Sequence, residues 1–186
     1  MENNRKPYYN ATAPRPKGEN KEGQVTGTPW DFFNVLNDEF GFAYDLAAST
    51  ENTKCSQYIT EEEDSLTVDW HLLAPDRWHY LNPPFANMTP WVSKCKMEMD
   101  LGAKIALLTR ASVDTQWYAD FVEQFTERRW PTPRLKFLGH TTTYPVPVML
   151  SLFETGREVK CFQWRWKLDG RRKFLAMQDA LSFDLD

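Results

Sequence analysis

Asn82-Pro83-Pro84-Phe85 are the residues of this chain whose types and spacing best suit chemistry. An exocyclic aromatic amine is a weak nucleophile, because its lone pair is delocalised into the ring. Two fixed acceptors, the Asn82 side-chain carbonyl and the Pro83 backbone carbonyl, would accept hydrogen bonds from the two amine N–H groups and so localise the lone pair on the nitrogen. Pro84 restricts Pro83 to extended backbone, so both acceptors are preorganised. Phe85 offers a flat face for a flipped-out base. The four residues therefore suit methylation of an amine such as adenine N6.

These four residues need elements that hold them in place. A strand is expected over residues 77–81, and a helix is expected to begin at Thr89-Pro90, where a capping residue precedes a proline. Taken alone, Asn-Pro is also a common turn opener, so a turn that merely ends a strand is the competing interpretation. The neighbouring segments decide between the two.

Composition bounds the class of protein. A chain of 186 residues with 41% hydrophobic residues suits one domain, and a net charge of −4 means that nucleic-acid binding would need a local basic patch. The three cysteines and three histidines lack metal-ligand spacing, which predicts reduced thiols and no metal. No apolar run has membrane-spanning length and no signal peptide is evident, so a cytoplasmic protein without a membrane partner is expected.

The order of elements predicts the fold. Residues 1–26 are polar and are expected to form a flexible tail. Thr28 is expected to cap a helix that starts at Pro29 and stops at Gly41, and further helices are expected from residue 89 and over 114–127. Strands are expected over residues 42–48, 55–59, 66–70, 77–81, 104–109, 134–138 and 146–153. This alternation favours a mostly parallel α/β sheet, in which Asp45 and Asn82 share one crevice at the strand ends.

Several of these segments together resemble the phage-type DNA N6-adenine methyltransferases, a Dam-like family that uses S-adenosylmethionine. The resemblance covers roughly residues 28–154. The pieces that carry it are Thr28-Pro29-Trp30, Phe40-Gly41-Phe42, Asp45-Leu46-Ala47-Ala48-Ser49, Asn82-Pro83-Pro84-Phe85, Thr89-Pro90-Trp91, Leu107-Leu108-Thr109-Arg110 with Asp114 and Trp117, and Arg134-Leu135-Lys136-Phe137. It implies a Rossmann-like class I methyltransferase with a catalytic domain over residues 27–156.

The resemblance also implies roles for particular residues. Asn82, Pro83, Pro84 and Phe85 correspond to the catalytic loop. The residues implied to bind the cofactor are Thr28, Pro29, Trp30, Asp45, Leu46, Ala47, Asp64 and Asp69. Thr28 would meet the methionine carboxylate and Asp45 the amino group, while Glu61, Glu62 and Glu63 compete with Asp64 for the ribose. The glycine-rich turn usual in methyltransferases is here Ala47-Ala48-Ser49.

The segment 157–186 is expected to be a basic and aromatic hairpin with a C-terminal tail. Residues 157–173 contain seven basic and two acidic residues, a local charge of +5, and Asp169-Gly170 is a hairpin turn signal. The expected DNA contacts are Arg110, Lys160, Arg165, Lys167, Arg171 and Arg172. Two structural alternatives remain: an edge hairpin whose aromatic residues cover the core, and a surface ion pair between Arg110 and Asp114.

The predicted function is methyl transfer from S-adenosylmethionine to adenine N6 of double-stranded DNA, without a metal. The resemblance implies a phage enzyme that protects DNA from host restriction, and a homodimer is compatible with the sequence. Alternative acceptors are cytosine N4, an RNA base or a protein amide. A second alternative is a catalytically silent DNA-binding or anti-restriction module on the same fold.

Overall fold

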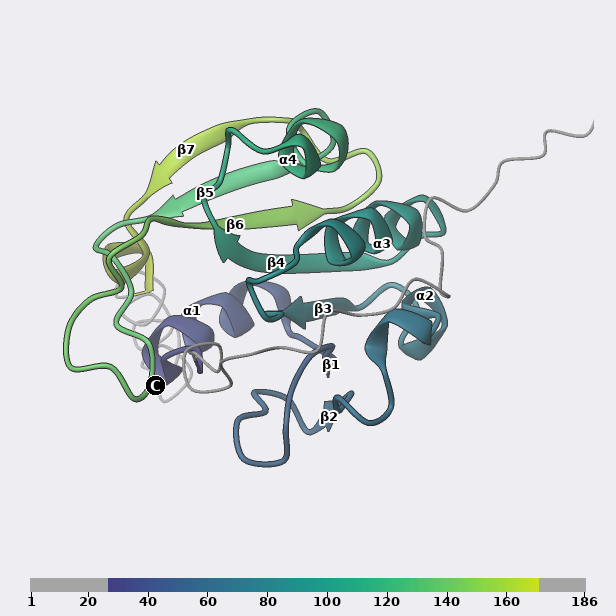
Figure 1. Cartoon of the computed structure of the whole chain (residues 1–186), viewed down its shortest axis with the longest axis horizontal. Coiled ribbons are helices and arrows are strands. Elements are labelled where there is room, and N and C mark those ends of the chain that lie inside the picture. Colours follow the sequence, from purple (N-terminus) through teal and green to yellow (C-terminus); the bar gives the residue numbers. More distant parts are fainter. Residues whose placement is uncertain (1–26, 171–186) are drawn as a thin grey trace, which may run out of the picture.

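A seven-stranded sheet forms the centre of the molecule (Figure 1). The computed structural model describes residues 27–170, so the predicted tail over residues 1–26 and the last sixteen residues, 171–186, lie outside it. The strands follow the order β2-β1-β3-β4-β6-β5-β7 across the sheet. Their bounds are β1 Tyr44–Asp45, β2 Gln57–Tyr58, β3 Trp78–Leu81, β4 Lys104–Arg110, β5 Glu127–Pro131, β6 Val148–Phe153 and β7 Cys161–Trp164.

Strand direction decides where functional loops gather. β1, β2, β3 and β4 pair in parallel, β6 is antiparallel to both its neighbours, and β7 runs parallel to β5. All strands except β6 therefore point their carboxyl ends to the same edge of the sheet. This confirms the predicted mostly parallel α/β sheet, and it places the segments after β1, β3, β4, β5 and β7 at one edge.

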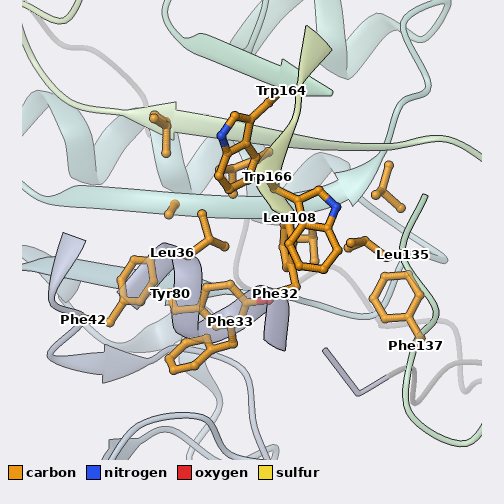
Figure 2. Close-up of a cluster of buried hydrophobic side chains, with 14 of the residues drawn as sticks. Phe32, Phe33, Leu36, Phe42, Tyr80, Leu108, Leu135, Phe137, Trp164 and Trp166 are labelled. Atoms are coloured by element: carbon orange, nitrogen blue, oxygen red, sulfur yellow. The ribbon is translucent and has the colours of Figure 1, made fainter. Parts of the chain in front are cut away.

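Helices cover both faces of this sheet. They are α1 Trp30–Phe40, the 3-10 helix η2 Ser65–Thr67, α2 Trp70–Leu73, α3 Thr89–Asp100 and α4 Gln116–Phe121. Alternate residues of β4 enter two separate cores: Leu108 packs with Phe32 of α1, whereas Leu107 packs with Val92 of α3. Figure 2 shows the α1 side of the sheet, where Phe32 lies against Trp166 with ring centroids 5.2 Å apart.

Helix α1 begins one residue later than expected. Pro29 is the extended capping residue and the helix starts at Trp30, without a side-chain cap. The Thr28 hydroxyl instead shares a hydrogen bond of 2.6 Å with the Tyr80 hydroxyl. Thr28 is therefore not the helix cap, because a buried partner on β3 takes its oxygen. The predicted stop at Gly41 is confirmed: its φ of 59° is left-handed, and its amide donates to the Asn37 carbonyl.

Three predicted elements near the sheet are wrong. Residues 66–70 do not form a strand, because Trp70 is buried in α2 and its indole nitrogen donates to the Ser65 carbonyl over a local turn. Residues 134–138 have the buried alternation of a strand at Leu135 and Phe137 but lack regular sheet pairing. The helix expected to reach residue 127 ends at Phe121, and β5 follows.

The expected antiparallel hairpin at the C-terminus is also wrong. β7 pairs in parallel with β5, and residues 166–170 are helical, so Asp169-Gly170 is not a hairpin turn. Packing explains the change, since Trp164 and Trp166 are buried against Phe32 and direct this segment over α1. The predicted return strand from Arg171 lies outside the described residues.

Candidate active site

Asp45 and Asn82 lie at the ends of neighbouring parallel strands. Asp45 is in register with Tyr80, and the amide of Leu46 donates to the Tyr80 carbonyl over 2.8 Å. From β1 the chain continues to β2 on one side, and from β3 it continues to β4 on the other. This is the topological switch point of the sheet, where open α/β folds bind their ligands. The structure therefore brings these two predicted site residues to one place.

A buried hydrogen-bond network fixes the Asn82 side chain. The Asn82 amide nitrogen donates to the Thr28 hydroxyl oxygen over 3.2 Å, and the same oxygen bonds the Tyr80 hydroxyl. Thr28 is only 1% exposed. Because Thr28 takes the amide nitrogen of Asn82, the amide carbonyl is the end of the side chain turned away from Thr28. The sequence predicted a role for each of Thr28 and Asn82 but did not predict that they touch.

Phe85 borders an aromatic and cationic cluster that the sequence only partly predicted. The Arg110 guanidinium lies 5.6 Å from the Phe85 ring centroid and 5.9 Å from that of Tyr144, and its Nε donates to the Tyr144 hydroxyl over 2.9 Å. The Phe85 and Tyr144 rings are 6.4 Å apart at an angle of 64°. Tyr144 was missed because it lies in an irregular segment between β5 and β6. Within residues 27–170, Arg110 forms no ion pair with Asp114.

Asp45 is a buried acid. It is 3% exposed, and its carboxylate accepts the backbone amides of Lys54, at 3.0 Å, and Ala47, at 3.4 Å. Burial raises the pKa of Asp45 from its ordinary 3.8 to about 6, although the two amides and the Lys54 charge act in the opposite direction. A cationic partner beside this acid would favour its ionised, carboxylate form.

The turn after Asp45 does not require glycine. Residues 46–49 contain no residue with positive φ, so alanine and serine adopt this backbone without strain. The departure Ala47-Ala48-Ser49 therefore leaves the turn intact. Close to this turn is a residue that sequence reasoning missed: Lys54 is 9% exposed, and its ammonium lies 4.0 Å from the Trp30 ring centroid. No periodic pattern in the sequence indicates this contact.

Asp64 and Asp69 lie in the segment between β2 and α2. Two residues after Asp69, the His71 amide donates to Glu98 in the last turn of α3, beside the amino end of β4. Asp64 is half-buried and has a left-handed φ of 53°. Asp69 is exposed at the amino end of α2, outside the hydrogen-bonded group of Thr28, Tyr80 and Asn82. Asp69 thus lies toward the edge of the sheet opposite Asn82. The cofactor-binding roles of both acids stay predictions.

The predicted DNA-binding residues fall into separate groups. Arg165 and Lys167 are exposed just after β7, at the edge of the sheet that carries Asn82. Lys160 precedes β7, at the opposite edge, and its ammonium bonds Glu158 at 2.8 Å and lies 3.9 Å from Glu127. The aromatic residues Trp164 and Trp166 cover the core, as the structural alternative proposed. Arg171 and Arg172 lie outside the described residues.

The described part of the chain has neither a cluster of metal ligands nor a membrane-spanning helix. Residues 27–170 contain no group of three or more histidine, cysteine, aspartate or glutamate side chains arranged to hold a metal ion. In the same range, no helix combines the length and the apolar character that crossing a membrane requires.

The fold and the switch-point site define a Rossmann-like methyltransferase, with a buried acid after β1 and Asn-Pro-Pro-Phe after β3. Comparison with known proteins specifies the family. The DNA N-6-adenine-methyltransferase (Dam) family matches residues 17–150, most of the chain. The chain therefore belongs to the Dam family.

Individual relatives agree with this assignment. The chain is 31% identical over 136 residues to the DNA N-6-adenine-methyltransferase of Haemophilus phage HP1, covering 68% of this chain and 76% of that protein. It is 28% identical over 120 residues to the enzyme of the same name from Escherichia phage T1, covering 62% of this chain but only 49% of the relative. The putative methyltransferase YfdM of Escherichia coli K12 is 36% identical over 81 residues, 41% of this chain and 85% of that protein.

Proposed function

We propose that this chain transfers a methyl group from S-adenosylmethionine to N6 of adenine in DNA. The observation that carries the proposal is the position of Asn82. Its amide nitrogen is held by Thr28, and it follows the strand that neighbours Asp45. Membership of the Dam family and the names of the phage relatives support adenine N6 of DNA as the acceptor. A role in marking phage DNA against host restriction, within the host cytoplasm, is part of the same proposal.

The residues present fit the cofactor. S-adenosylmethionine supplies a methyl group that is already activated on a sulfonium. The buried Asp45 carboxylate suits the cofactor's ammonium, because a cationic partner removes the penalty that burial imposes on the charged acid. Thr28, Pro29 and Trp30 lie at the amino end of α1, where backbone amides suit an anion. Leu46 and Ala47 border the site directly after β1.

Asn82 and Pro83 would hold the amine that accepts the methyl group. The Asn82 carbonyl and the Pro83 carbonyl each accept a hydrogen bond from one N–H group of the amine, which returns electron density to the nitrogen. Phe85 stacks on the base, and the Arg110–Tyr144 hydrogen bond holds the neighbouring ring in place. The proton lost by the methylated amine passes to water, so the main contribution of the protein is alignment.

The first test is methylation of unmethylated duplex DNA by the purified protein, followed by digestion and mass spectrometry of the nucleosides. N6-methyldeoxyadenosine is expected from the wild type. Asn82→Ala should lower turnover about 100-fold or more, as for loss of a preorganised polar group, while cofactor binding persists. Asn34→Ala, at an exposed position of α1, is the control and should behave as the wild type. Equal turnover of Asn82→Ala and wild type would reject the role of Asn82.

A further inference from the structure

Lys54 is a buried lysine that forms no ion pair within the described residues, although the Asp45 charge acts on it electrostatically. The side chain is 9% exposed, and its ammonium contacts the face of the Trp30 ring at 4.0 Å. Within residues 27–170 it forms no ion pair, although its own backbone amide bonds Asp45. Buried lysines are normally paired, because removing an ammonium from water is costly. Burial lowers the pKa of Lys54, as expected for an amine in this environment.

The residue that the Lys54 ammonium contacts, Trp30, also begins a helix, whose amino end is a second source of positive potential. Trp30 is the first residue of α1, an eleven-residue helix without a side-chain cap. Of its first amides, that of Phe32 bonds the Asp31 carboxylate and that of Phe33 bonds the Pro29 carbonyl. The amides of Trp30 and Asp31 have no acceptor among residues 27–170. The Lys54 ammonium thus contacts the side chain of the residue whose backbone begins α1, and a helix amino end together with an ammonium suits an anionic group.

The anion must also suit the neighbouring acid. Asp45 accepts the Lys54 amide, so an anion bound by Lys54 would lie close to a carboxylate that itself suits a cation. A single ligand that carries an anionic and a cationic group close together satisfies both side chains. An α-amino acid has this arrangement, since its ammonium and carboxylate share one carbon atom.

We propose that Lys54 binds the α-carboxylate of the methionyl part of S-adenosylmethionine, while Asp45 binds its α-ammonium. This inference rests on the proposed function and deepens it, since it assigns the cofactor's amino-acid end to a lysine after β1. Lys54 then acts as a positioning residue: it fixes one end of the cofactor relative to the Asn82 loop. The structure also raises a competing interpretation, in which Lys54 occupies the face of Trp30 that a sulfonium would use.

Calorimetric binding of three ligands to the full chain separates these interpretations. S-adenosylmethionine carries both the carboxylate and the sulfonium, S-adenosylhomocysteine lacks the sulfonium charge, and decarboxylated S-adenosylmethionine lacks the carboxylate. Lys54→Met keeps the length of the side chain and removes its charge, and Lys54→Arg keeps the charge. Lys96→Met is the matched control, because Lys96 lies on α3 and pairs with Asp100.

We expect Lys54→Met to lower the affinities for S-adenosylmethionine and S-adenosylhomocysteine alike, by about 10–100-fold, as for loss of a hydrogen bond to a charged group. Decarboxylated S-adenosylmethionine should bind the wild type and Lys54→Met equally. Lys54→Arg should retain the preference for the carboxylated ligand, which keeps the test decisive if Lys54→Met does not fold. Lys96→Met should bind all three ligands as the wild type does.

Two outcomes would overturn the proposal while leaving methyl transfer intact. If Lys54→Met lowered the affinity for all three ligands equally, Lys54 would have only a structural role. If the variant bound S-adenosylmethionine more tightly relative to S-adenosylhomocysteine, Lys54 would occupy the sulfonium position. A wild type that bound neither S-adenosylmethionine nor S-adenosylhomocysteine would overturn the proposed function and this inference together.

Discussion

At the scale of single residues, we expect Asp45 to couple ligand binding to pH. Its pKa is raised to about 6 by burial, so the free protein holds a neutral acid below that pH and a carboxylate above it. A ligand ammonium needs the carboxylate. We therefore expect the affinity for S-adenosylhomocysteine to be constant above about pH 7 and to fall toward tenfold per pH unit below pH 6. Calorimetry between pH 5 and pH 8 measures this.

Asp45→Asn provides the control for this profile. Its affinity should be weaker at pH 8 and should lack the decrease below pH 6, because an amide does not titrate. A wild-type profile without that decrease would show that Asp45 does not bind the ammonium. Lys54 and Cys55 lie close enough to act on Asp45 electrostatically, but burial raises the pKa of Cys55 to about 12, so its thiol stays neutral throughout this range.

The same residue affects folding stability in the opposite direction. Since the folded state raises the pKa of Asp45, its contribution to stability is present below pH 3.8 and is lost as the pH rises to about 6. At pH 7, Asp45→Asn should therefore unfold at higher urea concentration than the wild type. The gain in the free energy of unfolding is at most about 3 kcal/mol. It is reduced because the side-chain amide that replaces the carboxylate loses one of the two hydrogen bonds that the carboxylate accepts from backbone amides. A less stable variant would mean that the two amides outweigh burial.

At the scale of elements, β4 and the segment before β6 join at the Phe85 cluster. Because Arg110 bonds Tyr144 and faces the Phe85 ring, we expect it to position the base-binding face. Tyr144→Phe, which loses only the hydroxyl, and Arg110→Ala should both lower turnover about 10-fold, as for loss of one hydrogen bond to a charged group.

The salt dependence of DNA binding distinguishes this positioning role of Arg110 from a direct contact with a DNA phosphate. If Arg110→Ala lowered the slope of log K against log salt by about 1 while Tyr144→Phe retained full turnover, Arg110 would contact phosphate instead.

The elements also show which features the sequence could predict. β3, β4 and β6 were expected because their residues are mostly apolar and turn signals bound them. β5 was missed because it begins Glu127-Arg128-Arg129, which looks like an exposed helix end. These charges are buried. Arg129 pairs with the distant Glu39, and Glu127 pairs with the distant Arg157, whereas Arg128 donates to the nearby Glu123 carbonyl. Likewise, Lys54 and Tyr144 gain their significance only from contacts across the fold.

Helix α3 contains two ion pairs with the same spacing and different burial. Glu98 is fully buried and binds Lys94 and His71, each at 2.7 Å, whereas Asp100 is mostly exposed in its pair with Lys96. Glu98→Gln should lower the free energy of unfolding by about 3–5 kcal/mol, since it leaves the Lys94 charge buried. Asp100→Asn should cost under about 1 kcal/mol. Urea titration of both variants measures the difference, and equal costs would contradict this account.

At the scale of the whole molecule, a chain of net charge −4 must bind a polyanion through local charge. The basic residues predicted to contact DNA lie at opposite edges of the sheet. Arg165 and Lys167 are exposed at the edge that carries Asn82 and Asp45, while Lys160 lies at the opposite edge beside Glu127 and Glu158. The sequence grouped all three in one basic segment, because the direction of β7 cannot be read from local composition.

This separation gives a prediction about DNA binding. Replacing Arg165 and Lys167 together with alanine should weaken binding and lower the slope of log K against log salt by up to about 2, because each contacted phosphate contributes about 0.9. Lys160→Ala, of the same residue class in the same segment, should leave the slope unchanged. Fluorescence anisotropy with a labelled duplex over a salt series measures both. If Lys160→Ala reduced the slope and the double variant did not, DNA would approach the other edge of the sheet, away from Asn82, and the proposed active site would be misplaced.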